Sequence, residues 1–569
     1  MQILQFDVNS IEYELVKPEV KIYEKVDESE KKKVIEDALV LFVSVEKGDT
    51  PEIAKKAIDD ASAFMATLKR KRLVIYPYAH LSNNLESPQL ALEKLQHMRN
   101  FAADKGLEVF SSAFGWNKRW TLAIKGHPMA EQSKRYGSSA IKPAPGPAEQ
   151  KIDASRSKPV DLSIVRKSDW SGLPDSDHRT IGERLNLYSF QEISPGMVYW
   201  HNNGYIVFKE LMKYIRERLD EYGYQEIATP ALASLALWHV SGHIDKYRDD
   251  MFLFETDSQA MGLKPMNCPS TIMVYKSKRW SYRELPVRLA DFDKLYRNEI
   301  SGALSGLFRV REFIQDDAHL FVTEAQVQDE LIKILMLVKE LYGKFGMEYK
   351  AKVSTMPDNH LGDDKLWEKA TEALKLALTT NGMKFEVKDK EGAFYGPKID
   401  FDVKDSMGRE WQCATVQLDY QLPQRFGLEY TGEDGKQHAP VIIHRVIYGS
   451  IERFIGVLTE HLHGKFPAWL SPVQVRVITI SEQTNDYAQS IYKKLKEKHF
   501  RAEIDVSDRT LEYKVRDAKM MEINYTIIVG KKEQESGTIS IRGRDNKQRM
   551  GVTLDDFARE LEEEVRLRK

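Results

Sequence analysis

Side chains that could bind a charged, elongated ligand recur at every second position between Phe308 and Phe321. The residues at these positions are Arg309, Arg311, Phe313, Gln315, Asp317 and His319. Alternation with a period of two predicts a strand with one buried face and one face that carries these groups. Arginine suits phosphate because its planar guanidinium donates two hydrogen bonds at once. Taken alone, the alternation favours a solvated sheet face with cross-strand ion pairs over a binding site.

The segment immediately upstream extends this polar face. FDKLYRNE, residues 292–299, is also strand-like, and a loop rich in Gly and Ser, residues 300–307, joins it to the first segment. Two such strands around a short loop predict an antiparallel hairpin. Arg297 and Glu299 are in phase with each other, and same-face residues are about 7 Å apart along a strand. A ligand could therefore lie along the hairpin with its anionic groups near the arginines.

A strand, a turn and a helix are predicted in PVIIHRVIYGSIERFIG, residues 440–456. Ser450 follows the turn and is a plausible N-cap of the helix. Arg453 then falls in the first helical turn, where the helix dipole disfavours a cation. An anion bound there would remove the conflict, because phosphates often bind at helix N-termini. This segment favours a binding site over a solvated face.

The cysteine in GLKPMNCPST, residues 262–271, has unusual neighbours. Pro265 and Pro269 lie on either side of Cys268, which is untypical of a core cysteine. We expect Cys268 to be held on a turn.

Composition indicates a soluble protein with several domains. The chain has 569 residues, of which 42% are apolar and 30% charged, and its net charge of −2 gives no overall attraction to nucleic acid. Two cysteines cannot form a disulfide framework, so a reducing compartment is expected. No run of about 18 apolar residues predicts a membrane span, and the N-terminus lacks the pattern of a secretory signal. We therefore expect a cytoplasmic protein.

Hydrophobic periodicity divides the chain into three folded regions. The strand-like stretches are 34–47, 72–82, 473–480, 501–507 and 525–530, and the helical stretches are 51–70, 203–220, 323–345, 364–381, 486–500 and 511–521. Strand–helix–strand order near the C-terminus predicts a mainly parallel or mixed sheet. Residues 138–160 are rich in Pro, Ala, Gly and Ser without periodicity, which predicts a linker.

These segments, in this order, resemble a class II aminoacyl-tRNA synthetase, and specifically the archaeal kind of threonyl-tRNA synthetase. YGYQEIATPAL resembles motif 1, in which Pro230 would lie at a dimer interface; YRNE with FRVREFIQDDAHLF resembles motif 2, and YGSIERFIG resembles motif 3. The stretches typical of threonyl enzymes are KPMNCPST, GAFYGPKIDF, WQCATVQLDYQLP and VIIHR.

The resemblance implies a multidomain protein of the α/β and α+β classes. Residues 1–140 would form an α/β editing domain like D-aminoacyl-tRNA deacylases, and residues 141–184 a linker. Residues 185–470 would form the class II catalytic domain on an antiparallel sheet, and residues 471–569 an α/β anticodon-binding domain.

One zinc ion per subunit is implied, bound by Cys268, His319 and His444. Their separations of 51 and 125 residues are far too long for a local zinc signature. Three protein ligands would leave zinc an open position, to which the family binds the threonine amino group and hydroxyl.

The remaining pocket residues are also implied by the resemblance. Those for threonine are Met266, Asp317, Tyr395, Gln417 and Ser450, with Asp317 accepting from the hydroxyl. Those for ATP are Arg297 at the α-phosphate, Arg309 and Arg453 at the β- and γ-phosphates, and Glu299 at the adenine. Gln315 would lie near the α-phosphate and Lys398 near both substrates, and Mg²⁺ would accompany ATP.

An editing function is implied for the N-terminal region. IEYE, SVEK, YPYAHLS, AFGWNKRW and KGHPMAEQS resemble the archaeal editing domain, with functional positions at His80, Lys118 and Glu131. The residue before the lysine is usually Tyr and is Asn117 here. In the C-terminal region Glu533 and Arg542 match positions that read anticodon bases. A Pro-Tyr usual in that domain is replaced by Asn524-Tyr525, which should affect a local turn more than function.

The implied function is threonine–tRNA ligation: ATP-dependent formation of threonyl-adenylate, transfer to tRNA(Thr), and hydrolysis of seryl-tRNA(Thr) by the N-terminal domain. A homodimer is expected from motif 1. A ligase for another amino acid, a synthetase-like RNA-binding regulator without ligase activity, and a deacylase with an added RNA-binding region are the alternatives. The implied Cys/His/His set disfavours the first, the three arginines the second, and residues 185–470 the third.

Overall fold

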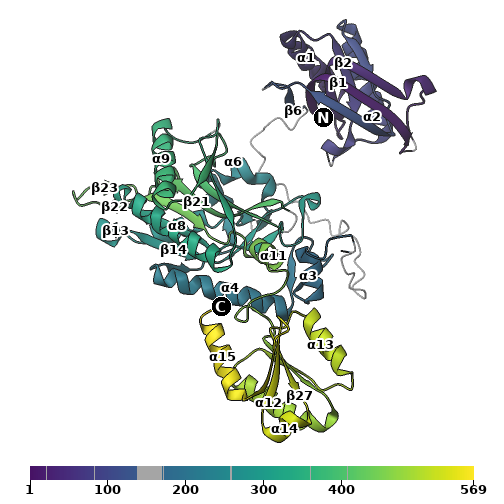
Figure 1. Ribbon diagram of the computed structural model, residues 1–569. Helices are drawn as coiled ribbons and strands as arrows, with labels where there is room; N and C mark the ends of the chain where they lie inside the picture. The colour runs from purple at the N-terminus through teal and green to yellow at the C-terminus, as the bar shows by residue number, and fades with distance from the viewer. Residues whose placement is uncertain are drawn as a thin grey trace. The chain divides into compact units, whose positions relative to one another are not determined.

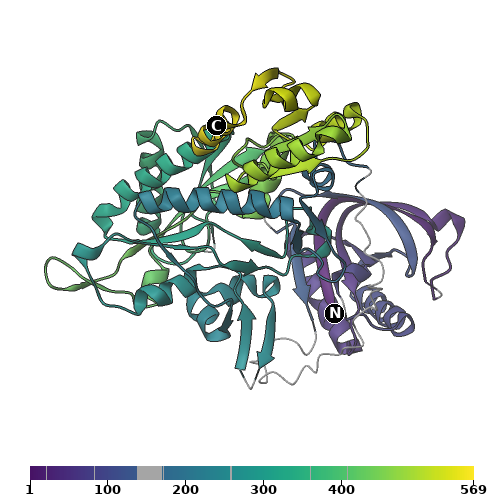
Figure 2. The same cartoon turned by 90° about the horizontal axis from the view of Figure 1, so that it is seen from below.

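The computed structural model describes residues 1–20, 22–82, 84–127, 129–136, 170, 172–256, 259–358, 360–405 and 408–569. The chain divides into two compact units, residues 1–150 and 151–569, which Figures 1 and 2 show from two directions. No helix in these described ranges is both long enough and apolar enough to cross a bilayer.

A six-stranded sheet forms the N-terminal unit, drawn in purple in Figure 1. Its strands are β1 (Gln2–Pro18), β2 (Lys32–Ser44), β3 (Arg72–Pro77), β4 (Glu108–Ser111), β5 (Trp116–Ile124) and β6 (Glu131–Arg135), in the order β4–β3–β2–β1–β5 with β6 also paired to β1. Helices α1 (Pro51–Leu68) and α2 (Pro88–Asp104) pack on the face that carries Leu39, Leu41 and Val43. Val40 and Phe42 point into a second core on the other face. The apolar run of β2 is therefore explained by burial on both faces.

An eight-stranded sheet forms the centre of the second unit. Its order is β19 (Phe385–Lys388), β18 (Tyr349–Ser354), β20 (Lys398–Lys404), β21 (Glu410–Asp419), β24 (Val441–Val446), β17 (Asp317–Val322), β14 (Val287–Asp291) and β9 (Gln225–Ile227). All neighbours from β18 to β14 are antiparallel, and only the outer pairs β18–β19 and β9–β14 are parallel. The antiparallel catalytic sheet expected from the sequence is thus present.

Helices cover this sheet with one large hydrophobic core. They are α4 (Asn202–Glu221), α8 (Val327–Lys344), α9 (Asp364–Thr380) and α11 (Ile451–His461). The first three match the predicted helices 203–220, 323–345 and 364–381, because each sequence places its apolar residues on one helical face. Smaller elements complete this part: α3 (His178–Arg184), α5 (Leu235–Ser241), α6 (His243–Tyr247), α7 (Cys268–Lys276), α10 (Leu422–Arg425), β7 (Tyr188–Phe190), β8 (Val198–Trp200), β10 (Leu232–Ser234), β11 (Leu253–Thr256), β12 (Gln259–Leu263), β13 (Trp280–Ser281), β15 (Lys294–Tyr296), β16 (Glu312–Ile314), β22 (Tyr430–Thr431) and β23 (Gln437–His438).

The C-terminal part, yellow and light green in Figure 1, has a mixed five-stranded sheet. Its order is β26 (Ala502–Asp505), β25 (Val475–Thr479), β27 (Tyr525–Val529), β28 (Ile539–Gly543) and β29 (Gln548–Val552), with α12 (Asn485–Glu497), α13 (Leu511–Met520), α14 (Lys531–Ser536) and α15 (Leu554–Arg566). The three strands β26, β25 and β27 are parallel and the last two pairings are antiparallel. This agrees with the mainly parallel or mixed sheet predicted from the alternation of strands and helices in the sequence.

Two expectations about local structure need correction. The stretch 308–321 is not one strand, because β16 ends at Ile314 and β17 begins at Asp317. Gln315 between them forms a bridge to Ser450, so the chain leaves its pairing with β15 and enters the main sheet. The predicted hairpin remains as the pair β15–β16.

The predicted linker 141–184 also contains a folded element. Its residues up to 169, and Ser171, lie outside the described residues, but α3 is a helix whose first residue, His178, is fully buried. Seven residues are too few to show a helical period in the sequence.

Gly204 provides a test of how tightly α4 packs. A Cβ at Gly204 would overlap the carbonyl oxygen of Leu187, whereas a Cβ at Gly343 in α8 would meet no atom within 4 Å. Gly204→Ala should therefore lower the free energy of unfolding by about 1–3 kcal/mol. Gly343→Ala should raise it by up to about 1 kcal/mol, because alanine favours helix. Chemical denaturation of both variants measures the difference, and equal stabilities would contradict the close approach.

Candidate active site

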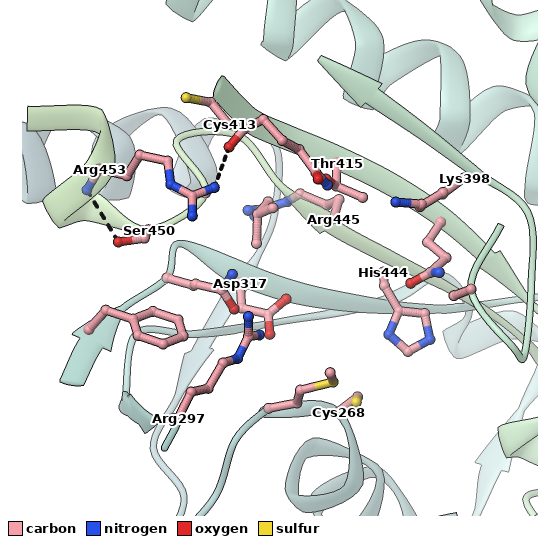
Figure 3. A pocket seen from close by; sticks show the side chains of 18 of the residues that line it. Cys268, Arg297, Asp317, Lys398, Cys413, Thr415, His444, Arg445, Ser450 and Arg453 are labelled. Carbon is pink, nitrogen blue, oxygen red and sulfur yellow. Dashed lines mark hydrogen bonds between the residues drawn. The ribbon is translucent and has the colours of Figure 1, made fainter. Parts of the chain in front are cut away.

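A cavity of about 410 Å³ lies on one face of the central sheet. The cavity is lined by every residue that the sequence analysis assigned to threonine, ATP or the metal: Met266, Cys268, Arg297, Glu299, Arg309, Gln315, Asp317, His319, Tyr395, Lys398, Gln417, His444, Ser450 and Arg453. Figure 3 shows Ser450 and Arg453 at one end and Cys268 and His444 at the other, with Asp317 between them in this view. Residues from widely separated parts of the sequence, between Met266 and Arg453, are thus brought to one place.

Strand register explains why four of these residues meet. Lys398 of β20 lies opposite Gln417 of β21, Gln417 lies opposite His444 of β24, and His444 lies opposite His319 of β17. Cross-strand partners point to the same face of a sheet and lie about 5 Å apart. These four side chains therefore form one row across four strands, and Asp317 joins the same face two residues before His319.

Cys268, His319 and His444 form a cluster that could hold a metal ion. Their ligand atoms lie within 4.8 Å of one another, and all three residues are buried. Cys268 is the first residue of α7 rather than part of a turn as expected. Nδ1 of His319 is buried without a hydrogen-bond partner. Buried polar atoms without a hydrogen-bond partner are rare in folded proteins. Coordination of a metal ion would give Nδ1 of His319 the partner that it lacks.

Asp419 orients one of these histidines. Its Oδ2 lies 3.0 Å from Nε2 of His444, and a carboxylate can only accept, so Nε2 carries the proton and the lone pair is on Nδ1. Oδ1 of Asp419 accepts from the backbone nitrogens of Gln421 and Leu422 at 2.7 and 3.0 Å. This carboxylate–histidine arrangement is typical of metal sites. Burial raises the pKa of the Cys268 thiol well above its usual value, and a divalent cation would offset that cost.

Arginines also line the cavity. Arg453 donates from its side chain to the carbonyls of Phe308 and Gln412 at 2.9 and 2.8 Å, and its backbone nitrogen donates to the capping hydroxyl of Ser450. Burial, with the nearby charges of Arg297 and Arg309, lowers the pKa of Arg453. Burial also lowers the pKa of Arg297. Cations held together in a partly desolvated site favour anionic ligands.

Arg311 does not belong to this group, although its position in the alternation suggested it. Its guanidinium donates to the carbonyls of Glu299 and Pro195 and to the hydroxyl of Ser301. It thus closes the loop that precedes β16 and does not line the cavity.

The N-terminal unit contains a second cavity, of about 390 Å³, lined by Asn117, Lys118, Tyr76 and Trp120 among others. The ammonium of Lys118 lies 4.6 Å from the centre of the Tyr76 ring. Desolvation by these surroundings lowers the pKa of Lys118 to about 7, a value typical of a group that takes part in chemistry.

The other two predicted editing residues are placed differently. Backbone atoms of His80 lie in the short helix η2 (Ala79–Leu81), beside Ala79, which lines the cavity, but its side chain lies outside the described residues. Glu131 pairs with Phe6 of β1, whereas Lys118 pairs with Leu15 of the same strand. At about 3.3 Å per residue these positions are roughly 30 Å apart along β1. Within one chain, therefore, Glu131 does not join Lys118.

Both predicted anticodon residues have partners within their own domain. Glu533 accepts from the backbone nitrogen of Gly530 and from the hydroxyl of Ser540, at 3.0 and 2.8 Å. Arg542 in β28 donates to Asn546 at 3.0 Å. The first pattern caps α14, so Glu533 has a structural function whatever else it binds.

Three family models match the chain. The class II core domain of tRNA synthetases for G, H, P, S and T matches residues 252–462. The archaea-specific editing domain of threonyl-tRNA synthetase matches residues 1–136, and an anticodon-binding domain matches residues 474–564. The threonine–tRNA ligase catalytic subunit of Sulfurisphaera tokodaii is 51% identical over 400 residues, which cover 70% of this chain and 74% of that protein. The chain belongs to the threonyl-tRNA synthetase family.

Other relatives of the family agree. The threonine–tRNA ligase of Thermotoga petrophila is 49% identical over 69% of this chain, and the match spans 62% of that longer protein. Among solved structures, a domain of the threonyl-tRNA synthetase of Cryptosporidium parvum described as RNA-binding has a TM-score of 0.66 and 42% identity over 68% of this chain and 98% of its own. A putative threonyl-tRNA synthetase of Aeropyrum pernix has a TM-score of 0.61 and 30% identity over 69% and 96%.

These comparisons confirm the family and fold class predicted from the sequence. They also confirm an aminoacyl-tRNA ligase for threonine with an editing domain, and they lend no support to a regulator without ligase activity.

Three buried polar residues near the cavity were missed by the sequence analysis. Asp419 contacts His444 as described. Asp316 accepts from the backbone nitrogens of residues 447–449, and burial raises its pKa to about 7. His243 lies with Nε2 3.2 Å from Sδ of Met266 and 3.8 Å from Sγ of Cys268, and burial lowers its pKa to about 3. A single polar residue that is not part of a periodic pattern or motif cannot be recognised as functional in one sequence. These three residues are identified only by their contacts in the folded chain.

Removal of the Asp419 carboxylate tests the metal cluster. In Asp419→Ala, His444 loses the acceptor that orients it, so we expect metal affinity to fall about 10- to 100-fold. Competition with a zinc-sensitive dye, followed on the purified protein without any substrate, measures this affinity. Asp405→Ala, which removes a carboxylate that accepts from Arg409 and Trp411, is the control. Unchanged zinc affinity in Asp419→Ala would contradict the assigned orientation.

Proposed function

We propose that the central cavity joins threonine to ATP, giving threonyl-adenylate and pyrophosphate, and then transfers the threonyl group to tRNA(Thr). One observation supports this above all others: three arginines and a buried Cys/His/His cluster line one cavity. The arginines suit a triphosphate, and the cluster suits an amino acid whose side chain bears an oxygen. The family's activity agrees with this division.

Zinc is the metal we propose for Cys268, His319 and His444. One thiolate and two neutral imidazoles are a donor set typical of zinc, and three protein ligands leave a position open. A bound zinc ion would supply a Lewis acid to which an amino group and a hydroxyl can coordinate. Burial lowers the pKa of His319 well below its usual value, which keeps this imidazole neutral and available as a ligand.

Asp317 is the proposed acceptor for the threonine hydroxyl. Burial raises its pKa to about 6, although His444 and Arg445 oppose the shift; a divalent cation bound beside it would favour the ionised carboxylate. Nδ2 of Asn267 donates to its Oδ2 at 3.3 Å and helps to hold its direction. Tyr395 donates to Oε1 of Gln417 at 2.8 Å, which leaves the amide nitrogen of Gln417 for the substrate. Met266 and Ser450 complete the proposed threonine pocket.

ATP would bind along the arginines. We propose Arg297 for the α-phosphate, Arg309 and Arg453 for the β- and γ-phosphates, and Glu299 for the adenine side. Gln315, two residues before Asp317, is proposed near the α-phosphate. Lys398, whose ammonium is 2.7 Å from Asp400, is proposed near both substrates. Mg²⁺ would offset the remaining phosphate charge. These residues act by placement and charge stabilisation.

Substrate choice follows from this chemistry. Valine has the shape of threonine but lacks the hydroxyl, and a site built around an oxygen ligand rejects such an analogue by several orders of magnitude. Serine keeps the hydroxyl and lacks one methyl, which is worth only about 1–3 kcal/mol. Serine would therefore be attached too often, which explains the need for an editing domain.

We propose that editing takes place in the N-terminal cavity, with Lys118 and His80 in functional positions. Asn117, where the family usually has Tyr, also lines this cavity. Glu131 is proposed to act in editing from outside this cavity.

The proposed division of the chain is residues 1–140 for editing, 141–184 as a connecting segment that includes α3, 185–470 for catalysis and 471–569 for binding the anticodon. Glu533 and Arg542 are proposed to contact anticodon bases. A cytoplasmic homodimer is proposed as the working form.

Pyrophosphate exchange with threonine, serine and valine tests the synthetic site. We expect strong exchange with threonine, weaker but measurable exchange with serine, and exchange with valine near background, because only valine lacks an oxygen for the metal. Radiolabelled pyrophosphate incorporated into ATP provides the measurement. Equal rates with valine and threonine would refute the metal-based choice.

Seryl-tRNA clearance tests the editing cavity. Lys118→Ala should leave threonine-dependent exchange unchanged and slow the hydrolysis of seryl-tRNA(Thr) at least about 100-fold, the scale of a lost general acid or base. Arg119→Ala is the control, because Arg119 is the next residue of β5 and does not line the cavity. Clearance of labelled seryl-tRNA at wild-type rate in Lys118→Ala would remove Lys118 from the site.

A further inference from the structure

The first residue of α3, His178, makes a set of contacts that the reaction described above does not use. His178 is fully buried, and it lies in the segment whose sequence predicted a linker. Nδ1 lies 2.8 Å from Oε1 of Glu460 near the end of α11. Nε2 lies 3.1 Å from the backbone nitrogen of Leu307, in the loop between β15 and β16. One imidazole thus connects a helix and a loop that are far apart in sequence.

Both ring nitrogens have fixed roles. The backbone N–H of Leu307 can only donate, so Nε2 must offer its lone pair. Nδ1 must then carry the proton and donate it to the carboxylate of Glu460, which also accepts from the backbone nitrogen of His178 at 3.0 Å. Because the tautomer and both partners are determined, the ring has one orientation.

These hydrogen bonds leave neither ring nitrogen of His178 free to bind a metal ion. The carboxylates of Asp177 and Glu460 lie close enough to His178 to resemble a metal site. Neither imidazole nitrogen has a lone pair to spare, however, because Nε2 uses its lone pair on Leu307. The Asp177 carboxylate accepts two hydrogen bonds from the guanidinium of Arg179 at 2.9 and 2.8 Å. The cluster is therefore a hydrogen-bonded support.

The loop that His178 holds carries the ATP side of the cavity. Phe308 follows Leu307; its ring centroid lies 4.0 Å from that of His178 and 4.5 Å from that of Trp411. The carbonyl of Phe308 accepts from Nε of Arg453 at 2.9 Å. Arg309, the next residue, lines the cavity. Two of the three arginines thus depend on the position of residues 307–309.

Gly306 brings the loop close enough for this contact. A Cβ at Gly306 would overlap Nε2 of His178, and its φ of +52° is one that residues with a side chain seldom adopt. The backbone of the loop therefore lies directly against the imidazole.

We propose that His178 is a positioning residue for the ATP phosphates. It fixes the backbone at Leu307, so that Arg309 and the Phe308 carbonyl that holds Arg453 are in place before ATP binds. This inference rests on the proposed function of Arg309 and Arg453. It requires that His178 act through the loop, without contact to ATP, and that it leave the threonine half of the cavity unaffected.

Two substitutions at His178 separate its two hydrogen bonds. His178→Asn retains a donor near the place of Nδ1 but loses the acceptor for Leu307, so we expect KM for ATP in pyrophosphate exchange to rise about 10- to 100-fold. KM for threonine should stay within about twofold, because Cys268 and His444 lie at the other end of the cavity from Arg453 (Figure 3). His178→Gln places an oxygen near the position of Nε2 and should therefore have a lower KM for ATP than His178→Asn.

Ile181→Ala is the matched control. Ile181 is a buried core residue of the same helix, so its truncation should lower Tm while KM for ATP stays within about twofold. Should His178→Asn fail to fold, Glu460→Ala replaces it, since this removes the acceptor for Nδ1 that orients the imidazole, so that Nε2 no longer faces Leu307. The same selective rise in KM for ATP is expected.

The outcomes distinguish this inference from the proposed function. Wild-type protein without threonine-dependent exchange would refute the proposed function itself. Normal wild-type exchange together with an unchanged KM for ATP in His178→Asn, or in Glu460→Ala if the first variant does not fold, would overturn only the inference about His178. A parallel rise of both KM values, or an equal effect of Ile181→Ala, would also overturn it, because either result indicates a general structural role.

Discussion

The antiparallel register of four central strands is the constraint on which the candidate active site depends. It places Lys398, Gln417, His444 and His319 in one row on one face of the sheet. A shift of one residue in any of these strands would turn its side chain to the opposite face. The large core on the covered face prevents such a shift, because a slip would expose its buried side chains. The position of the proposed metal ligands is thus set by packing on the opposite side of the sheet.

Around this row, the site holds charges that burial makes costly. The pKa of Arg297 and of Arg453 is lowered by burial, and that of the Cys268 thiol is raised by it. Bound anions at the arginines and a cation at the thiol would offset both costs. The stability lost by holding these groups in place is recovered when ligands bind, which is the usual compromise at a preorganised site. The same reasoning explains why buried carboxylates such as Asp316 and Asp419 each accept several hydrogen bonds.

Support for the ATP side comes from a different part of the fold. Residues 307–309 lie between α3 and the sheet, and His178 with Glu460 connects them to α11, the helix that begins next to Ser450 and Arg453. Loop residues that bind phosphates need such support, because a loop on its own has many conformations. α3 is too short for a periodic pattern, and its function is evident only from its contacts.

The sequence by itself determined the family, the order of the domains and the cavity residues assigned to the substrates and the metal. Each of these can be recognised from a short stretch of characteristic residue types. Helices such as α4, α8 and α9 could also be predicted, since their apolar faces repeat every three to four residues. Tertiary structure alone decided the rest. The break between β16 and β17, the removal of Arg311 from the cavity, the distance between Glu131 and Lys118, and the roles of Asp419 and His178 depend on contacts between residues far apart in sequence. No local pattern encodes such contacts, because the free energy of a buried hydrogen bond or ion pair depends on which distant groups the fold brings beside it.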